Sequence, residues 1–172
     1  MTTPRAEIAT PPNPPFTIRP AREADVPVIL ELIRELATYE KLLHEVTATE
    51  AGLRQRLFGP RPFAETLLAE ADGQAVGFAL FFHNFSTFLG KPGIYLEDIF
   101  VRPAFRGRGI GTAFFHELAR LAVERECGRL EWAVLNWNEP ALAFYRRLGA
   151  RAMSEWTVER LTGDGILRLA RA

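Results

Sequence analysis

The sequence predicts an α/β fold in which helices cover both faces of a mixed, mostly antiparallel sheet. Segments whose apolar residues alternate predict strands, and segments whose apolar residues recur every three or four positions predict helices. Together they give the order β-α-α-β-β-β-α-β-α-β-β. Asp72-Gly73 is a favourable hairpin turn, so the early strands on either side of it should be antiparallel. A strand–helix–strand crossover in the middle of the chain suits a mixed sheet rather than a purely antiparallel one.

The first elements are a short strand and two helices. Residues 16–19 alternate as a strand, and Asp25 suits the N-cap of the helix that follows. This helix is amphipathic and ends near Tyr39; its apolar positions are Val26, Ile29, Leu30, Ile33, Leu36 and Ala37. The segment Thr47-Ala48-Thr49-Glu50 has the pattern of a capping box and predicts a second, shorter helix.

Three strands should form the middle of the chain. Residues 63–69 and 75–82 alternate as the two arms of the hairpin. Residues 85–93 contain Gly90 and Pro92 and predict a loop, and residues 94–101 predict a third strand.

The last third should begin with a long helix from Ile110 to near Gly128, because its apolar residues form one stripe. A strand over residues 130–134 and a helix over residues 140–148 follow, with Asn138 as N-cap and Gly149 as the C′ residue. Two final strands are expected at residues 156–161 and 166–169, on either side of a glycine-containing turn.

The length of 172 residues fits one domain, which we expect to span residues 16–172. Residues 1–15 contain five prolines and no continuous apolar stretch, so we expect a flexible tail there and no secretory signal. Lys and Arg total 21, as do Asp and Glu, and without a basic surplus nucleic acid is not the expected partner. No apolar run is long enough to cross a bilayer, so no membrane association is expected.

Cysteine and histidine usage argues against disulfides and metals. Cys127 is the only cysteine, which excludes an intramolecular disulfide and favours a reducing, cytoplasmic location. His44, His83 and His116 are scattered without ligand spacing, so we expect no metal.

A glycine-rich segment between a strand and the long helix carries the strongest signal for chemistry. It reads Arg106-Gly107-Arg108-Gly109-Ile110-Gly111-Thr112. Glycines let backbone amides turn toward one point, and the helix N-terminus adds partial positive charge, so this segment can hold a pyrophosphate. Arg102, Arg106 and Arg108 would supply nearby cations.

Two other phosphate-binding motifs fit this segment poorly. A P-loop would need a lysine, and a dinucleotide fingerprint would need glycine where Thr112 stands. The simpler alternative is a turn that only begins a helix.

Arg106-x-x-Gly109-x-Gly111 resembles the Arg/Gln-x-x-Gly-x-Gly/Ala signature of the GCN5-related N-acetyltransferases. Residues 35–40, 95–101 and 137–145 are similar to the spermidine/spermine branch of that family, and the similarity runs from about Phe16 to the end. The resemblance implies the acetyltransferase fold with a splayed sheet, acetyl-CoA as co-substrate and a homodimer. It also implies these coenzyme-binding residues: Ile99, Phe100, Val101, Arg106, Gly107, Arg108, Gly109, Ile110, Gly111, Thr112, Asn138, Glu139, Pro140, Ala141 and Tyr145.

The same resemblance assigns the catalytic roles to Tyr145 and Glu97. Tyr145 would protonate the departing thiolate, and a phenol with a pKa near 10 is protonated at neutral pH. The alternative for Tyr145 is a boundary residue with its hydroxyl in water. Glu97 would take a proton from the incoming amine. Asp98 follows it in the strand, so the two should point to opposite faces, and we expect Asp98 to form a structural ion pair with an arginine.

The acceptor implied by the resemblance is a small cationic amine: a polyamine, a diamine or a lysine- or thialysine-like amino acid. Tyr39, Glu40, Glu97 and Glu131 would line its pocket. Residues 131–133 and 154–157 differ from the polyamine enzymes, which leaves the acceptor open. The alternatives are an enzyme that acetylates protein N-termini or lysines, and a catalytically silent module that senses acetyl-CoA.

Overall fold

A computed structural model describes residues 16–171, and the proline-rich segment 1–15 lies outside the described residues. Contacts divide the chain into two compact units, with the boundary between Ala133 and Val134. Within residues 16–171, the first unit contains the sheet and three α-helices, and the second contains two α-helices.

The first unit is built on one mixed sheet. Its strands are β1 (Thr17–Pro20), β2 (Glu65–Ala71), β3 (Gln74–Ser86), β4 (Lys91–Val101) and β5 (Leu130–Trp132). They lie in chain order across the sheet, with antiparallel pairs from β1 to β4 and a parallel pair between β4 and β5. The prediction of a mixed, mostly antiparallel sheet is confirmed.

The two hairpins differ in how well the sequence predicted them. Asp72 and Gly73 both have positive φ values, 52° and 74°, which suits the tight turn between β2 and β3. The loop predicted at residues 85–93 is present but shorter, at residues 87–90, because β3 continues to Ser86 and β4 already begins at Lys91. Pro92 is tolerated inside β4 for a geometric reason. The N–H of Ile94 donates to Arg129 O on the β5 side. The nitrogen of Pro92, two residues earlier, faces the same side at a position before β5 begins, so its missing N–H costs no bond between β4 and β3 or β5.

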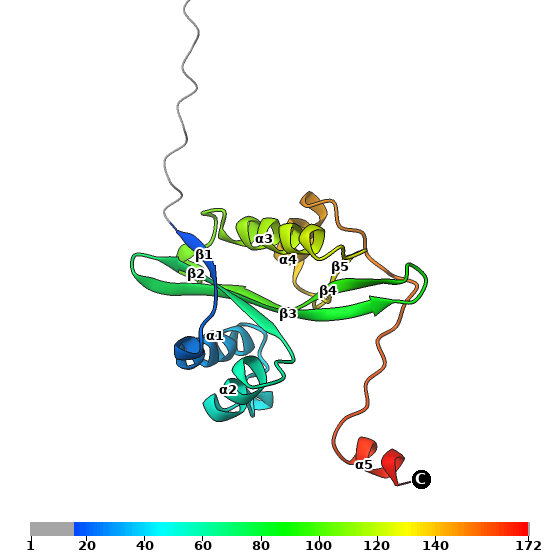
Figure 1. Cartoon of the computed structure of the whole chain (residues 1–172). Helices are drawn as coiled ribbons and strands as arrows, with labels where there is room; N and C mark the ends of the chain where they lie inside the picture. The colour runs from blue at the N-terminus through cyan, green and yellow to red at the C-terminus, as the bar shows by residue number, and fades with distance from the viewer. Residues whose placement is uncertain (1–15, 172) are drawn as a thin grey trace, which may run out of the picture. The chain divides into compact units, whose positions relative to one another are not determined.

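Helices cover both faces of this sheet (Figure 1). Helices α1 (Val26–Tyr39) and α2 (Glu50–Phe58) lie on one side, and α3 (Ile110–Glu124) lies on the other. Short 3-10 turns precede α1, α2 and α3, at Glu23–Asp25, Leu43–Glu45 and Pro103–Phe105. The core beneath α1 consists of Ile29, Leu32, Leu36, Leu68, Ala75, Phe78 and Phe100. The buried residues of α3 are Ile110, Phe114, Phe115, Leu118 and Leu121.

The predicted helix caps are only partly as expected. Asp25 occupies the N-cap position of α1, but its carboxylate bonds Arg19 and the Arg22 N–H instead of the helix. Thr49, rather than Thr47, caps α2: its hydroxyl oxygen accepts from the Gly52 N–H at 3.1 Å.

The second unit holds α4 (Glu139–Arg147) and α5 (Asp164–Ala170). Asn138 caps α4 by accepting from the Ala141 N–H, and Gly149 follows the helix with φ of 86°, both as predicted. The two final strands are wrong: residues 156–161 form no regular element, and residues 166–169 lie within α5. Alternating apolar residues favour a strand only when a neighbouring strand supplies its hydrogen bonds, and none is present in this unit.

Candidate active site

Strands β4 and β5 pair over a short distance and then separate. Their register joins only Ile94–Leu96 of β4 to Leu130–Trp132 of β5. Beyond Leu96, the edge of β4 that faced β5 has no neighbouring strand within the described chain. The separation begins at a β-bulge: Leu80 of β3 pairs with Asp98 and Phe81 pairs with Leu96, so Glu97 has no partner residue.

The bulge decides which backbone groups face the open edge. Before it, the Ile94 N–H points toward β5. After it, the Arg102 N–H donates to Val76 O of β3, so the groups of Ile99 and Val101 must point away from β3. Ile99 therefore offers its N–H and C=O, and Val101 its N–H, to a ligand that lies along this edge, whereas Val101 O already accepts from Arg106 Nε. Phe100 pairs with Phe78, and its ring belongs to the core beneath α1.

The glycine-rich loop continues from the same end of β4. Gly107 and Gly109 have φ values of 76° and 86°, and Gly109 is the N-cap of α3. A Cβ atom at either position would meet nothing within 4 Å, so glycine is required here for its backbone conformation and not for lack of space. Within the described chain, no backbone N–H of residues 107–112 donates a hydrogen bond. The first bond of the helix runs from the Ala113 N–H to Gly109 O at 2.9 Å.

The three arginines near this loop have different partners. Arg102 is held by Glu31 and Glu35 of α1 and by Ala75 O, and these carboxylates raise its pKa. Arg102, which was expected to supply a cation near the loop, is therefore already paired with carboxylates of α1. Arg108 donates to Ala104 O and stacks on the Phe105 ring at 4.8 Å.

Arg106 points back toward β4 and α1. Its Nε donates to Val101 O at 2.9 Å. Its guanidinium lies over the Tyr39 ring at 4.7 Å and over the Phe100 ring at 5.6 Å. The first residue of the glycine signature thus contacts the end of α1, where Tyr39 and Glu40 stand.

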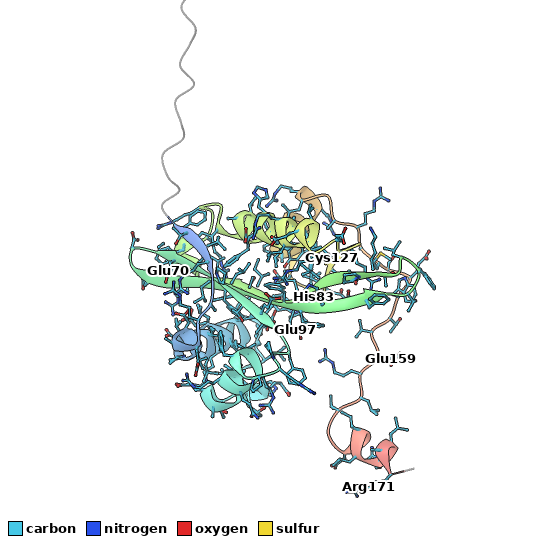
Figure 2. All side chains as sticks on the ribbon, in the orientation of Figure 1. Glu70, His83, Glu97, Cys127, Glu159 and Arg171 are labelled. Carbon is cyan, nitrogen blue, oxygen red and sulfur yellow. The ribbon has the colours of Figure 1, made fainter. Side chains whose placement is uncertain are left out.

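Three carboxylates gather beside the bulge. Glu97, midway along β4, is exposed (Figure 2), whereas Asp98 is half-buried. Burial, and after it the negative charges of Glu97 and Glu40, raise the pKa of Asp98 to about 6. Burial also raises the pKa of Glu40. Asp98 pairs with Leu80, which packs against the core beneath α1, so its side chain lies on the α1 side of the sheet.

Two expectations for this pair fail. Glu97 and Asp98 were expected on opposite faces, but the bulge interrupts the alternation on which that expectation depended. Asp98 was expected to pair with an arginine, yet within residues 16–171 neither Asp98 nor Glu97 takes part in an ion pair. The pKa of Asp98 is therefore set by burial and by the neighbouring negative charges, and no ion pair with an arginine lowers it.

Glu131 of β5 is already bonded. Its carboxylate accepts from Asn84 Nδ2 at 2.7 Å and pairs with Arg129 Nε at 2.9 Å. Glu131 lies opposite Tyr95 in the register, and the Tyr95 ring contacts Phe82 at 5.2 Å. The family resemblance predicts Glu131 in the acceptor pocket but gives no indication of Asn84, because a bond between residues 47 positions apart leaves no local signal in the sequence.

The remaining predicted residues belong to the second unit. Asn138, Glu139, Pro140 and Ala141 form the capped first turn of α4, with Pro140 where its missing N–H costs no hydrogen bond. Tyr145 lies on α4, and its ring contacts that of Phe144 at 5.5 Å. The structure therefore brings together the open β4 edge, the glycine loop and the carboxylates in the first unit, and it places Tyr145 in the second.

No group of three or more His, Cys, Asp or Glu side chains within residues 16–171 is arranged to hold a metal ion. Among the described helices, none has the length and apolar content that crossing a bilayer requires.

Comparison with known proteins identifies the family. The acetyltransferase (GNAT) family model matches residues 29–150. The thialysine N-epsilon-acetyltransferase of Bos taurus is 42% identical over 164 residues, covering 89% of this chain and 96% of that protein. L-ornithine N5-acetyltransferase NATA1 of Arabidopsis thaliana is 34% identical, with coverage of 87% and 85%. A solved integron cassette protein from the mobile metagenome of V. cholerae superposes with a TM-score of 0.78 at 25% identity, covering 92% and 99%. The chain belongs to the acetyltransferase (GNAT) family.

Proposed function

We propose that this acetyltransferase moves the acetyl group of acetyl-CoA to the primary amine of a small cationic acceptor, by direct transfer in a ternary complex. The acceptor would be a polyamine, a diamine or a lysine- or thialysine-like amino acid. The observation that carries this proposal is the group formed by Glu40, Glu97 and Asp98, which lies beside the open edge of β4 without an arginine partner. Unpaired carboxylates favour a substrate that brings its own positive charges. Relatives named for thialysine and ornithine acetylation support it.

The residues present fit acetyl-CoA. The N–H and C=O of Ile99 and the N–H of Val101 suit an extended amide-containing arm that adds to the sheet like a strand, with Phe100 between them; the Val101 carbonyl already accepts from Arg106. The unbonded amides of residues 107–112 at the start of α3 suit a pyrophosphate. Residues 138–141, at the capped start of α4, would border the coenzyme as the family resemblance implies.

The carboxylates would prepare the amine. An alkyl ammonium has a pKa near 10.4, so at neutral pH it must lose a proton before it can attack a thioester. We assign this proton to Glu97, directly or through water, and we add Asp98 as a second acceptor. With a pKa of about 6, Asp98 is a better proton acceptor at neutral pH than an ordinary aspartate and is still largely ionised. Tyr145 would return a proton to the departing thiolate.

A thiol-release assay with a panel of amines tests the proposal. Diamines and thialysine-like amino acids should release coenzyme A with a higher kcat/KM than uncharged alkyl amines of the same length. Activity on peptides alone would favour acetylation of protein N-termini or lysines. Coenzyme binding without thiol release from any amine would favour a silent sensor of acetyl-CoA.

We also propose that the protein is a homodimer that works in the reducing cytoplasm. Supporting the dimer, residues 153–169 of the second unit expose seven large apolar side chains, among them Trp156, which is 71% exposed. Exposed apolar side chains in this number favour association with a second copy. The single cysteine, Cys127, supports a reducing location. Sedimentation velocity at several protein concentrations tests the dimer, and a purely monomeric species at micromolar concentration would contradict it.

A further inference from the structure

Arg106 has two different sets of neighbours. Its backbone belongs to the glycine loop, but its side chain contacts Val101 O, the Phe100 ring and the Tyr39 ring. The guanidinium therefore joins three elements: the loop before α3, the open edge of β4 and the C-terminal end of α1.

The end of α1 is held in a defined but costly conformation. The Leu42 N–H donates to Ala37 O at 2.7 Å and the Lys41 N–H donates to Thr38 O at 3.1 Å, which is the Schellman pattern. Lys41 takes the left-handed position with φ of 62°, where glycine is usual. A strained non-glycine residue persists only where surrounding contacts hold it. The stack of Arg106 on Tyr39 is one such contact, two residues before Lys41.

This end of α1 also carries Glu40, one of the three carboxylates proposed to bind the acceptor. Glu40 lies between Tyr39 and Lys41, and its charge acts on Asp98, whose side chain lies on the same side of the sheet as α1. Holding Tyr39 in place therefore holds Glu40 at a fixed distance from Glu97 and Asp98.

We propose that the Arg106 side chain is a positioning residue for the acceptor: by stacking on Tyr39 and bonding Val101 O, it fixes Glu40 relative to Glu97 and Asp98 and so sets the preference for a doubly charged amine. The inference rests on the proposed function. It assigns the coenzyme contact of Arg106 to its backbone alone, because the guanidinium is already directed at α1 and β4.

Arg108 provides a matched control. It lies in the same loop, and its guanidinium also bonds a backbone oxygen and stacks on a ring, but both partners, Ala104 and Phe105, belong to the segment just before the loop. Removing either arginine takes one positive charge from the loop. Only removal of Arg106 breaks a link to α1.

The experiment measures two quantities in the full-length protein: the ratio of kcat/KM for a diamine to that for its isosteric monoamine at saturating acetyl-CoA, and the Kd of coenzyme A by calorimetry. Arg106→Met and Tyr39→Leu should each lower the ratio about two- to fivefold, the range for one exposed cation–π contact. The double variant should lose no more than either single one. Tyr39→Phe keeps the ring under the guanidinium, so it should retain more of the ratio than Tyr39→Leu. Arg108→Met should weaken coenzyme binding and leave the ratio unchanged.

Three outcomes would overturn the inference. The first is an unchanged ratio in Arg106→Met together with a coenzyme Kd as weak as in Arg108→Met, which would make Arg106 an anion-binding residue. The second is additive losses in the double variant, which would mean that Arg106 and Tyr39 act separately. The third is a wild-type protein that does not prefer the diamine. That result would refute the proposed acceptor itself, and the inference with it, whereas a wild-type preference for the diamine that is undiminished in Arg106→Met refutes only the inference.

Discussion

Replacing Asp98 by asparagine should make the protein more stable at neutral pH while impairing catalysis. Burial and the neighbouring carboxylates raise the pKa of Asp98 from an ordinary 3.8 to about 6. Between these two values, the folded protein holds a proton that the unfolded chain has already released. The contribution of Asp98 to the free energy of unfolding is therefore fully present below pH 3.8 and is lost as the pH rises through 6.

The size of the stability change follows from the difference between the two pKa values. Each pH unit between them corresponds to about 1.4 kcal/mol, so ionised Asp98 costs about 3 kcal/mol of unfolding free energy at neutral pH. Asparagine has nearly the same shape as the protonated acid and cannot ionise. The variant should match the wild type near pH 3.5 and exceed it by about 2–3 kcal/mol above pH 7.

Urea unfolding of both proteins at several pH values between 3.5 and 7.5 measures this difference. The difference between the two stability–pH curves contains no contribution from the carboxylates that both proteins share, including Asp25 and Glu65, whose pKa values are lowered by arginines. Glu70→Gln serves as a control of opposite sign, because Arg19 holds the pKa of Glu70 below its usual value and the variant should lose stability toward neutral pH. A wild-type-to-Asp98→Asn difference that stays constant with pH would refute the reasoning.

Three further predictions concern the chemistry. Gly109→Val should fold but lose most of its coenzyme affinity by calorimetry, because a β-branched residue resists a φ of 86° and the loop amides would turn away; unchanged affinity would disprove the cradle. Tyr145→Phe should lower turnover about ten- to a thousandfold with little change in coenzyme Kd, and turnover within twofold of wild type would make it a boundary residue. Glu97→Gln should displace the rise of activity with pH to higher values, and an identical pH profile would remove Glu97 from the proton path.

Local signals were sufficient for much of the fold. The hairpin turn at Asp72-Gly73 and the capped α4 were predicted because each depends on residues close in sequence. The glycine loop was also predicted, since positive φ at Gly107 and Gly109 needs no distant partner. The C-terminal strands were wrong for the opposite reason: apolar alternation records a preference for burial, and a strand also needs a neighbour to pair with.

The features that shape the active site were not visible in the sequence. A bulge at Glu97 adds one residue to β4 relative to β3, and an extended apolar strand looks the same with or without it. The link from Arg106 to Tyr39 joins residues far apart in the chain. Asp98 was recognised as a charged residue in an apolar strand, but whether an arginine would reach it depended on side-chain positions that only the three-dimensional structure gives.

The open edge of β4 has a consequence for handling the protein. Unpaired strand edges are templates for pairing with other chains, and natural proteins guard them with charges and bulges. Here the bulge at Glu97 and the charge of Asp98 lie where the edge begins, and Arg106 bonds Val101 O, but the backbone groups of Ile99 and the Val101 N–H remain uncovered when no coenzyme is bound. Acetyl-CoA would then act as a protective cover as well as a reactant. At a hundred times its Kd it would add about 2.7 kcal/mol of stability, and preparations that keep it present should resist aggregation through this edge.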